Sequence, residues 1–235
     1  MIKVLVNGAK GKMGQETVRA IQSDSELELV AAVDLGEDLI SVLKSSGAQV
    51  AVDFTSVEAG FANAAKILES GICPVIGTSG FTQGQVSELS QLAKEKRVGG
   101  LIAPNFAIGA VLMMKFAAEA AKYLPQVEIL ELHHDKKADS PSGTAVRTAE
   151  MIAASRIIRP AAIPDQAVIP GARGAELDGV YIHSMRLAGV VAQQLVVFGG
   201  VGQTLKIEHN SLNRESFMPG VCLAFKKVLD LKCLV

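Results

Sequence analysis

A strand, a glycine-bearing turn, a helix and a second strand open the chain, and this order constrains the fold more than any other feature. We expect them at residues 2–6, 7–14, 15–21 and 27–33. Gly11 would let the backbone approach a pyrophosphate, and Gly14 would let the helix pack close to the strand. With Gly8, these glycines depart from the usual G-x-G-x-x-G pattern, because Ala9 occupies its first glycine position.

The second strand ends in Asp34, about twenty residues after the turn, where an acidic side chain can bind a ribose hydroxyl. The glycines alone are weak evidence. Strand, glycines, helix, strand and terminal acid in this order predict a dinucleotide-binding site.

Strands and helices then alternate through the first half of the chain. We expect strands at residues 50–54, 73–76 and 100–103 and helices at residues 57–70 and 83–96. This alternation predicts an α/β fold with a Rossmann-type, doubly wound parallel sheet. Ligands bind such sheets at the carboxyl ends of the strands, which here are followed by residues 53–55, 77–80 and 103–106. Each of these segments, taken singly, is as readily a simple turn as a cofactor contact.

The second half has the pattern of a separate α+β domain. We expect a helix at residues 108–123, mostly loop at 158–182, and strands at 181–187, 193–198 and 204–209. Glycines and an asparagine separate these strands, in the manner of an antiparallel sheet. A last helix should begin at Arg214. The expected domains are a dinucleotide-binding domain at 1–105 with the carboxyl-terminal segment 211–235, and a substrate-binding and oligomerisation domain with a mixed or antiparallel sheet at 106–210.

Adjacent histidines follow a short strand at residues 127–132, which is apolar apart from two glutamates. This strand would deliver His133 and His134 at its carboxyl end. Histidine can give or take a proton near neutral pH, and an ammonium group nearby can stabilise negative charge or act as an acid. Taken alone, either histidine could be structural, and Lys136 and Lys137 could be ordinary solvated charges.

A Ser-Gly-Thr turn comes shortly after the lysines. Pro141 cannot donate a backbone hydrogen bond, so the link before it should be a loop. A helix expected at residues 144–153 places Ser142, Gly143 and Thr144 at a helix amino terminus, which can bind a carboxylate or phosphate. Together with the histidines and lysines, this turn indicates a site that holds an anion and moves protons.

Composition narrows the classes of function. Of the 235 residues, 49% are hydrophobic and 20% charged, and the net charge of −1 gives no basic field for nucleic acid or an anionic membrane. Cys73, Cys222 and Cys233 lack the spacing of paired metal ligands, so we expect reduced thiols, no metal site and a cytoplasmic protein. We expect no leader before the first strand, and no apolar run reaches the length of a membrane span.

The chain resembles 4-hydroxy-tetrahydrodipicolinate reductases, the bacterial and plant enzymes of lysine and diaminopimelate synthesis, over nearly its whole length. The motifs that occur in the order seen in that family are residues 8–14, 53–55, 77–81, 103–106 and 131–145. Among them, His-His-x-x-Lys-x-Asp-x-Pro-Ser-Gly-Thr-Ala is highly specific.

The resemblance implies an activity and a set of substrate-site residues. NADH or NADPH would reduce a cyclic dicarboxylate, 4-hydroxy-tetrahydrodipicolinate, to tetrahydrodipicolinate with loss of water, in a homotetramer. His133 matches the family's proton donor and acceptor, and Lys137 matches its second proton donor. Substrate contacts are expected from His134, Ser142, Gly143 and Thr144.

The resemblance also implies which residues hold the dinucleotide. The pyrophosphate loop corresponds to Gly8, Ala9, Lys10, Gly11, Lys12 and Met13, and the ribose acid to Asp34. The segments lining the nicotinamide correspond to Gly77, Thr78, Ser79, Ala103, Pro104, Asn105 and Phe106. No arginine follows Asp34 to hold a 2′-phosphate, which favours NADH, but Lys12 could reach a phosphate, so we expect both cofactors to be used.

The chain departs from the family's pattern at one further segment, and two other classes of protein are alternatives. The chain is short for this family between Glu37 and Gln49, so we expect a trimmed adenosine side. A cofactor-binding sensor or a dehydrogenase of another small acid could use a related nucleotide domain. A sensor, however, would not need His133, His134 and Lys137 together beside a carboxylate site.

Overall fold

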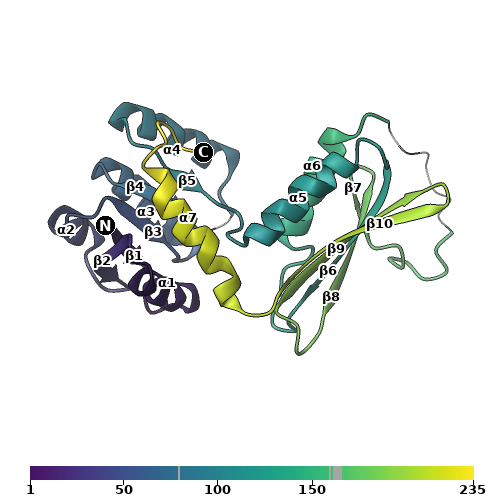
Figure 1. The fold of residues 1–235 in the computed structure, drawn as a ribbon, viewed down its shortest axis with the longest axis horizontal. Coiled ribbons are helices and arrows are strands. Elements are labelled where there is room, and N and C mark those ends of the chain that lie inside the picture. The colour runs from purple at the N-terminus through teal and green to yellow at the C-terminus, as the bar shows by residue number, and fades with distance from the viewer. Residues whose placement is uncertain (79, 159, 161–165) are drawn as a thin grey trace. The chain divides into compact units, whose positions relative to one another are not determined.

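The structure, a computed structural model, describes residues 1–78, 80–158, 160 and 166–235. The chain divides into two compact units, one formed by Met1–Phe106 with Phe217–Val235 and the other by Ala107–Ser216. Each unit has its own sheet (Figure 1). Among the described residues, none of the helices is both long enough and apolar enough to cross a membrane.

The first unit is built on a parallel sheet of five strands in the order β2-β1-β3-β4-β5. Its elements are β1 (Ile2–Asn7), α1 (Lys12–Ser23), β2 (Leu27–Val33), α2 (Leu39–Ser45), β3 (Val50–Asp53), α3 (Val57–Glu69), β4 (Cys73–Ile76), α4 (Gln83–Lys96), β5 (Leu101–Ile102) and α7 (Met218–Val228). The predicted parallel sheet is confirmed. Its strand order reverses at β1 and β3, the kind of position where such sheets bind ligands.

Helices cover both faces of this sheet because its strands are apolar on both sides. In β1, Val4 and Val6 point into one core and Leu5 into the other, as the two-residue period of a strand requires. Residues of α1 and α7 pack on the first face, and residues of α2, α3 and α4 pack on the second. The sheet is therefore doubly wound, as predicted.

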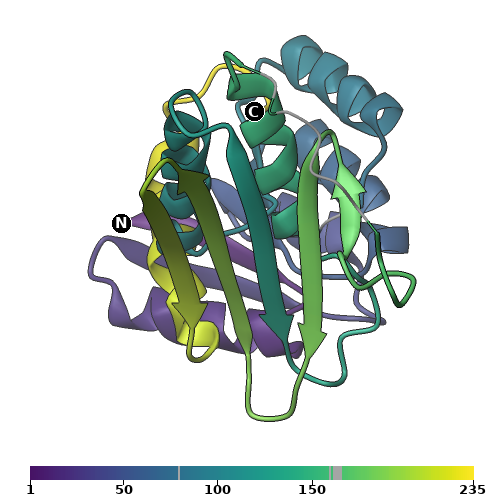
Figure 2. The same ribbon diagram turned by 90° about the vertical axis from the view of Figure 1, so that its right-hand side faces the viewer.

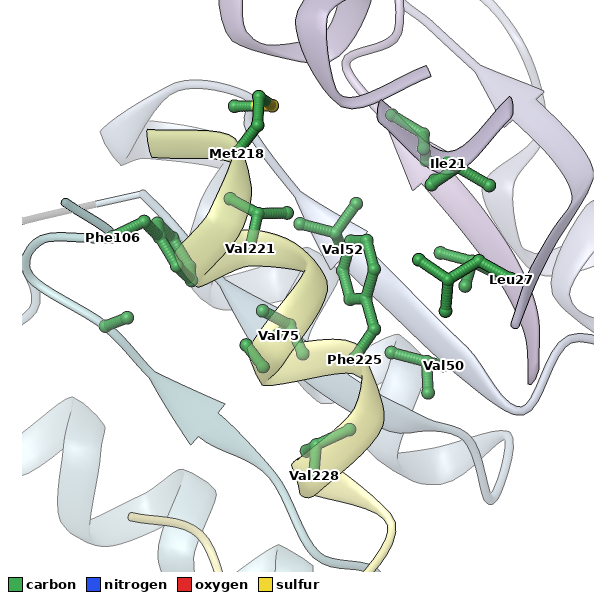
Figure 3. Packing of buried hydrophobic residues seen from close by; sticks show 14 residues of the cluster. Ile21, Leu27, Val50, Val52, Val75, Phe106, Met218, Val221, Phe225 and Val228 are labelled. Carbon is green, nitrogen blue, oxygen red and sulfur yellow. The ribbon is translucent and has the colours of Figure 1, made fainter. Parts of the chain in front are cut away.

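The last helix returns from the end of the chain to complete the first core. Figure 3 shows Val221, Phe225 and Val228 on the side of α7 that is turned toward Val50 and Val52 of β3. Phe225 has no exposed surface, and burying such a side chain contributes about 1.5–3 kcal/mol.

Two helices begin elsewhere than predicted, and one was missed. α1 begins at Lys12, earlier than expected, because Gly11 already caps it. The last α-helix begins at Met218 instead of Arg214, after a 3₁₀ turn, and Pro219 lies in its first turn, where a missing N–H group is tolerated. α2 lies in the link that was expected to be trimmed, and it is too short to give a periodic signal.

The second unit contains a mixed sheet in the order β10-β9-β6-β8-β7. Its elements are α5 (Ile108–Ala120), β6 (Gln126–His133), α6 (Gly143–Ser155), β7 (Ala175–Leu177), β8 (Val180–Arg186), β9 (Ala192–Gly200) and β10 (Gln203–Ser211). β6 and β8 pair in parallel, and the other neighbours are antiparallel. The parallel pair is possible because α6 provides a crossover between the two strands. Of the two predicted alternatives, the mixed sheet is correct.

One face of this sheet packs against α5 and α6, which lie behind it in Figure 2. Along β6, Val127 and Ile129 point into that core, whereas Glu128 and Leu130 leave the opposite face. Neither of the two described α-helices of this unit, α5 and α6, covers that opposite face.

β7 is a short strand within residues 158–182, which were expected to be mostly loop. It pairs with β8 through a two-residue turn of Asp178 and Gly179, both of which have positive φ. An Asp-Gly pair favours this turn type because glycine, and to a lesser degree aspartate, tolerates positive φ. The sequence therefore carried a hairpin signal that the prolines and glycines around it obscured.

Replacing Phe225 with alanine should lower the free energy of unfolding by about 3–5 kcal/mol, because the surrounding core cannot fully close the cavity. Chemical denaturation would measure the loss. Leu223→Ala, on the same helix at a side chain that is 48% exposed, should change it by roughly 0.5 kcal/mol or less. Equal effects of the two substitutions would mean that α7 does not complete the core.

Candidate active site

Glu131 and His133 lie two residues apart near the end of β6, so their side chains leave the same face of the strand. Glu131 Oε2 lies 2.5 Å from His133 Nδ1. His133 is the last residue of the strand and His134 follows it, close to the predicted boundary. The strand therefore delivers a histidine that already has a carboxylate partner.

Glu131 is completely buried, and a buried carboxylate is stable only when it is well paired. Arg186, the last residue of β8, provides a two-pronged contact: Nη1 lies 3.0 Å from Oε2 and Nη2 lies 3.0 Å from Oε1. The backbone N–H group of Ser142 donates to Oε1 at 3.2 Å. The parallel register of β6 and β8 sets His133 opposite Arg186, which explains how the guanidinium reaches the carboxylate.

These contacts determine which groups carry charge. Burial by itself raises the pKa of Glu131, but hydrogen bonds from Arg186, Ser184 and His133 outweigh burial and lower that pKa. Burial lowers the pKa of His133; Glu131 opposes this shift, and the positive charges of Lys137 and Arg186 add to it. Glu131 is thus an anion that accepts hydrogen bonds, and the His133 ring donates from Nδ1. Nε2 is the ring nitrogen left for another molecule.

Arg186 also holds the loop that carries Lys137. Its Nε donates to the carbonyl of Lys137 at 3.2 Å, and its Nη2 donates to the carbonyl of Asp139 at 2.6 Å. The Lys137 ammonium lies 2.7 Å from both carboxylate oxygens of Asp139, and this hydrogen bond lowers the pKa of Asp139. One guanidinium therefore fixes the position of Glu131 and of the Lys137 loop relative to each other.

α6 begins at the predicted Ser-Gly-Thr turn. Ser142 caps the helix by accepting a hydrogen bond from the N–H group of Ala145 at 3.2 Å. Gly143 is exposed, and none of the described atoms lies within 4 Å of the position that its Cβ would take. The first turn of α6, which is described in full, holds no acidic side chain to offset the positive end of the helix dipole.

The second unit thus brings His133, Lys137 and Ser142 of the predicted residues into one network. Glu131 had a sequence signal, since it is a carboxylate two residues before a histidine in an otherwise apolar strand. Arg186 had none, because its place depends on the pairing of β6 with β8.

His134 is half-buried, and its contact with a substrate stays a prediction, as do those of Gly143 and Thr144. Within the described ranges, no three His, Cys, Asp or Glu side chains gather as metal ligands.

In the first unit, the glycine turn forms a cradle between β1 and α1. Gly8 has a φ of +83°, which glycine adopts readily. A Cβ on Gly14 would lie 2.1 Å from the Gly8 carbonyl oxygen, so only glycine fits there. Gly11 caps α1 without a side chain, and the helix amino terminus suits a pyrophosphate. The remaining predicted residues of this loop are Ala9 and Lys10 in the turn and Lys12 and Met13 in the first turn of α1.

Asp34 follows β2, and its carboxylate turns back to the glycine turn. Oδ2 accepts from the N–H group of Lys10 at 2.6 Å and Oδ1 from that of Leu35 at 2.8 Å. These two hydrogen bonds, that of Lys10 first, lower the pKa of Asp34. The donor-rich turn and this anionic acid beside it fit a dinucleotide with its pyrophosphate at α1 and a ribose at Asp34.

Asp53 is a second buried carboxylate, and the sequence did not reveal its importance. Its Oδ2 accepts from Asn7 at 2.7 Å and from Asn63 at 3.0 Å, and its Oδ1 accepts from the hydroxyl groups of Thr55 at 2.7 Å and Thr78 at 2.9 Å. It therefore ties together the carboxyl ends of β1, β3 and β4. Thr78, a predicted cofactor residue, is held in place by this carboxylate.

An aromatic pair lies beside this network. The rings of Phe54 and Phe106 meet edge to face with 5.7 Å between their centroids, and a Cβ on Gly77 would lie 2.1 Å from the Phe54 ring. The other predicted residues that follow β5 are Ala103, Pro104 and Asn105. Ser79 lies outside the described residues. Contacts of these segments with a nicotinamide stay predictions.

Comparison with known proteins gives matches along the whole chain. The family model "Dihydrodipicolinate reductase, N-terminus" matches residues 2–106, and "Dihydrodipicolinate reductase, C-terminus" matches residues 109–233. The chain is 52% identical to the 4-hydroxy-tetrahydrodipicolinate reductase of Syntrophomonas wolfei subsp. wolfei, over 99% of this chain and 96% of that relative. It is 49% identical to the reductase of the same name from Halalkalibacterium halodurans, over 100% and 97%.

A solved structure agrees with these matches. The dipicolinate-bound dihydrodipicolinate reductase from Paenisporosarcina sp. TG-14 superposes with a TM-score of 0.89 at 42% sequence identity, covering 100% of this chain and 97% of that one.

Proposed function

Because the chain belongs to the 4-hydroxy-tetrahydrodipicolinate reductase family, we propose that His133 and Lys137 carry its chemistry and that the amino terminus of α6 binds its substrate. The reaction is the NAD(P)H-dependent reduction of 4-hydroxy-tetrahydrodipicolinate in diaminopimelate and lysine biosynthesis. The observation that carries the proposal is the buried Glu131 carboxylate, which binds His133 and the residue that caps α6.

The substrate is a cyclic dicarboxylate, and each carboxylate needs hydrogen-bond donors. We assign one carboxylate to the Ser142-Gly143-Thr144 turn, with His134 as a further contact. The exposed position of Gly143 and the positive end of the α6 dipole support this assignment. The homologue from Paenisporosarcina sp. TG-14 was solved with dipicolinate bound, which supports a cyclic dicarboxylate as the ligand of this family.

The protein's share of the chemistry is to hold charge and to deliver a proton. The substrate ring loses its hydroxyl group and a ring proton as water, and a bound nicotinamide would then supply the hydride that the ring accepts. His133, with Nε2 turned away from Glu131, and the ammonium of Lys137 then stabilise the negative charge that develops toward the ring nitrogen and supply the proton that neutralises it. Asp139 holds the ammonium in place until substrate arrives.

The cofactor is held, in this proposal, by the glycine turn and by Asp34. The N–H groups at the start of α1 receive the pyrophosphate, and the Asp34 carboxylate accepts a hydrogen bond from a ribose hydroxyl. Lys12, in the first turn of α1, can offset the 2′-phosphate of NADPH. Both cofactors are therefore expected to serve.

We also propose that the enzyme is a cytoplasmic homotetramer that buries the face of the second sheet opposite α5 and α6. Leu130, Tyr181, Leu195 and Val197 line a hollow of about 730 Å³ on that face, and large apolar surfaces of this kind favour association. The three cysteines are free thiols, which suits a reducing compartment. Sedimentation equilibrium should give four times the 24.7 kDa chain mass; a monomer mass would contradict the assembly.

Replacing Lys137 with alanine should lower kcat by about 10²–10⁴-fold, because a positioned acid typically contributes that much. Initial rates of NADH oxidation with freshly generated substrate would measure the loss, and the KM for NADH should change little. Lys136→Ala is the matched control, since Lys136 is the exposed neighbour on the same loop. Similar losses in both variants would remove Lys137 from the mechanism.

Asp34→Ala should raise the KM for NADH by about 10–100-fold, since losing a hydrogen bond to a charged group costs about 1.5–3 kcal/mol. The KM for NADPH should rise less, because the carboxylate that repels a 2′-phosphate is lost as well. Parallel initial-rate series with the two cofactors test this. An equal rise for both would mean that Asp34 acts only by holding the Lys10 turn.

A further inference from the structure

We propose that Glu131, clamped by Arg186, is the positioning residue for His133, holding the Nδ1–H group of the ring so that Nε2 faces the substrate. This inference deepens the proposed role of His133 and rests on it. Glu131 acts through the histidine and through the elements around it, without itself supplying the proton.

The contact with Glu131 determines which nitrogen of the His133 ring carries the proton. Oε2 lies 2.5 Å from Nδ1, and its carboxylate is completely buried, so water does not compete for the contact. The partner of one imidazole nitrogen decides which nitrogen carries the proton. Because Arg186 keeps Glu131 ionised and accepting, Nδ1 must be the donor, and Nε2 is left with a lone pair or, in the charged ring, with a proton to give.

The other glutamate of β6 shows what is particular about Glu131. Glu128 also pairs with a histidine and an arginine, His183 at 2.8 Å and Arg173 at 2.5 Å, but on the opposite face of the sheet. The side chain of Glu128 is 38% exposed, whereas that of Glu131 is completely buried. If Glu131 served only to stabilise the sheet, a partly exposed cluster like that of Glu128 would be enough.

Several partners of Glu131, in contrast, belong to the proposed site or hold its loop. Besides His133, it receives the N–H group of Ser142, the cap of the helix that is proposed to bind the substrate carboxylate. Through Arg186 it is linked to the carbonyl group of Lys137. The carboxylate therefore sets the relative positions of the proton donors and of the anion site.

Because Glu131 is charged, replacing it should change how the reaction rate depends on pH. Among the described residues, the charged groups that act on His133 are Glu131 on β6, Lys137 on the following loop and Arg186 on β8, and Asp139 pairs with Lys137. Of these, Glu131 raises the pKa of His133, while burial and the cations lower it. Glu131→Gln removes the raising influence, so His133 must lose its proton at a lower pH. A rate that needs protonated His133 should then lose its alkaline limb at lower pH than in the wild type.

Nitrogen-15 NMR of the wild-type ring tests the contact without any substitution. The chain has four histidines, and His133→Asn would assign the signals. The expected result is a neutral ring protonated at Nδ1, with Nε2 unprotonated above the pKa. A neutral ring protonated at Nε2 would overturn the proposal whether or not a Glu131 variant folds.

A double-mutant cycle separates positioning from mere support of the fold. We expect His133→Ala to lower kcat by about 10²–10⁴-fold and Glu131→Gln by roughly tenfold or more, with the alkaline limb shifted and NADH affinity unchanged. In the His133→Ala background, Glu131→Gln should cost much less than it does in the wild type, since residues that act through one another are not additive. Additive losses, or an unshifted limb, would contradict positioning.

Two further variants distinguish the proposed role of Glu131 from the proposed role of His133. Glu150→Gln removes the same charge from an exposed pair with Arg147 on α6, and it should leave both kcat and the pH profile unchanged. Near-normal turnover of His133→Ala would defeat the proposed role of His133, whereas an Nδ1-protonated ring in the wild type would still support the Glu131 contact.

Discussion

A carboxylate with no exposed surface must be met by donors or give up its charge, and the proposed substrate site of the second unit is arranged around that requirement at Glu131. The donors come from the end of β6, the end of β8 and the start of α6. Because Arg186 also binds the carbonyl groups of the Lys137 loop, these segments cannot shift independently. Catalysis by a histidine and an ammonium group requires such preorganisation, since a misplaced donor loses most of its effect.

The two units form their proposed binding sites from different kinds of groups. In the first, the proposed cofactor site is mostly backbone: the Gly8 carbonyl meets Gly14 so closely that no side chain fits between them, and Asp34 is held by N–H groups. Its buried carboxylate, Asp53, joins the strand ends and positions Thr78. In the second unit, charged side chains do most of the positioning. Substitutions of glycine should therefore damage cofactor binding, and substitutions of charge should damage turnover.

The sequence predicts those features of the structure that depend on residues close together along the chain. Alternating apolar strands and helices predicted the doubly wound sheet, and the turn before α6 predicted the helix cap at Ser142. The hydrogen-bond networks of Arg186 and Asp53 escaped prediction because their partners come from strands that are distant in sequence and adjacent only in the sheet. The Asp178-Gly179 hairpin was a local signal, overlooked among prolines and glycines that suggested loop.

The most direct test of this account is a crystal structure of the enzyme with dipicolinate, the dicarboxylate bound in the homologue from Paenisporosarcina sp. TG-14. One ligand carboxylate should bind the N–H groups at Gly143 and Thr144. His133 Nε2 should face the ligand while Nδ1 stays on Glu131. A ligand seated away from the start of α6, or a His133 ring that has left Glu131 to reach it, would contradict the account.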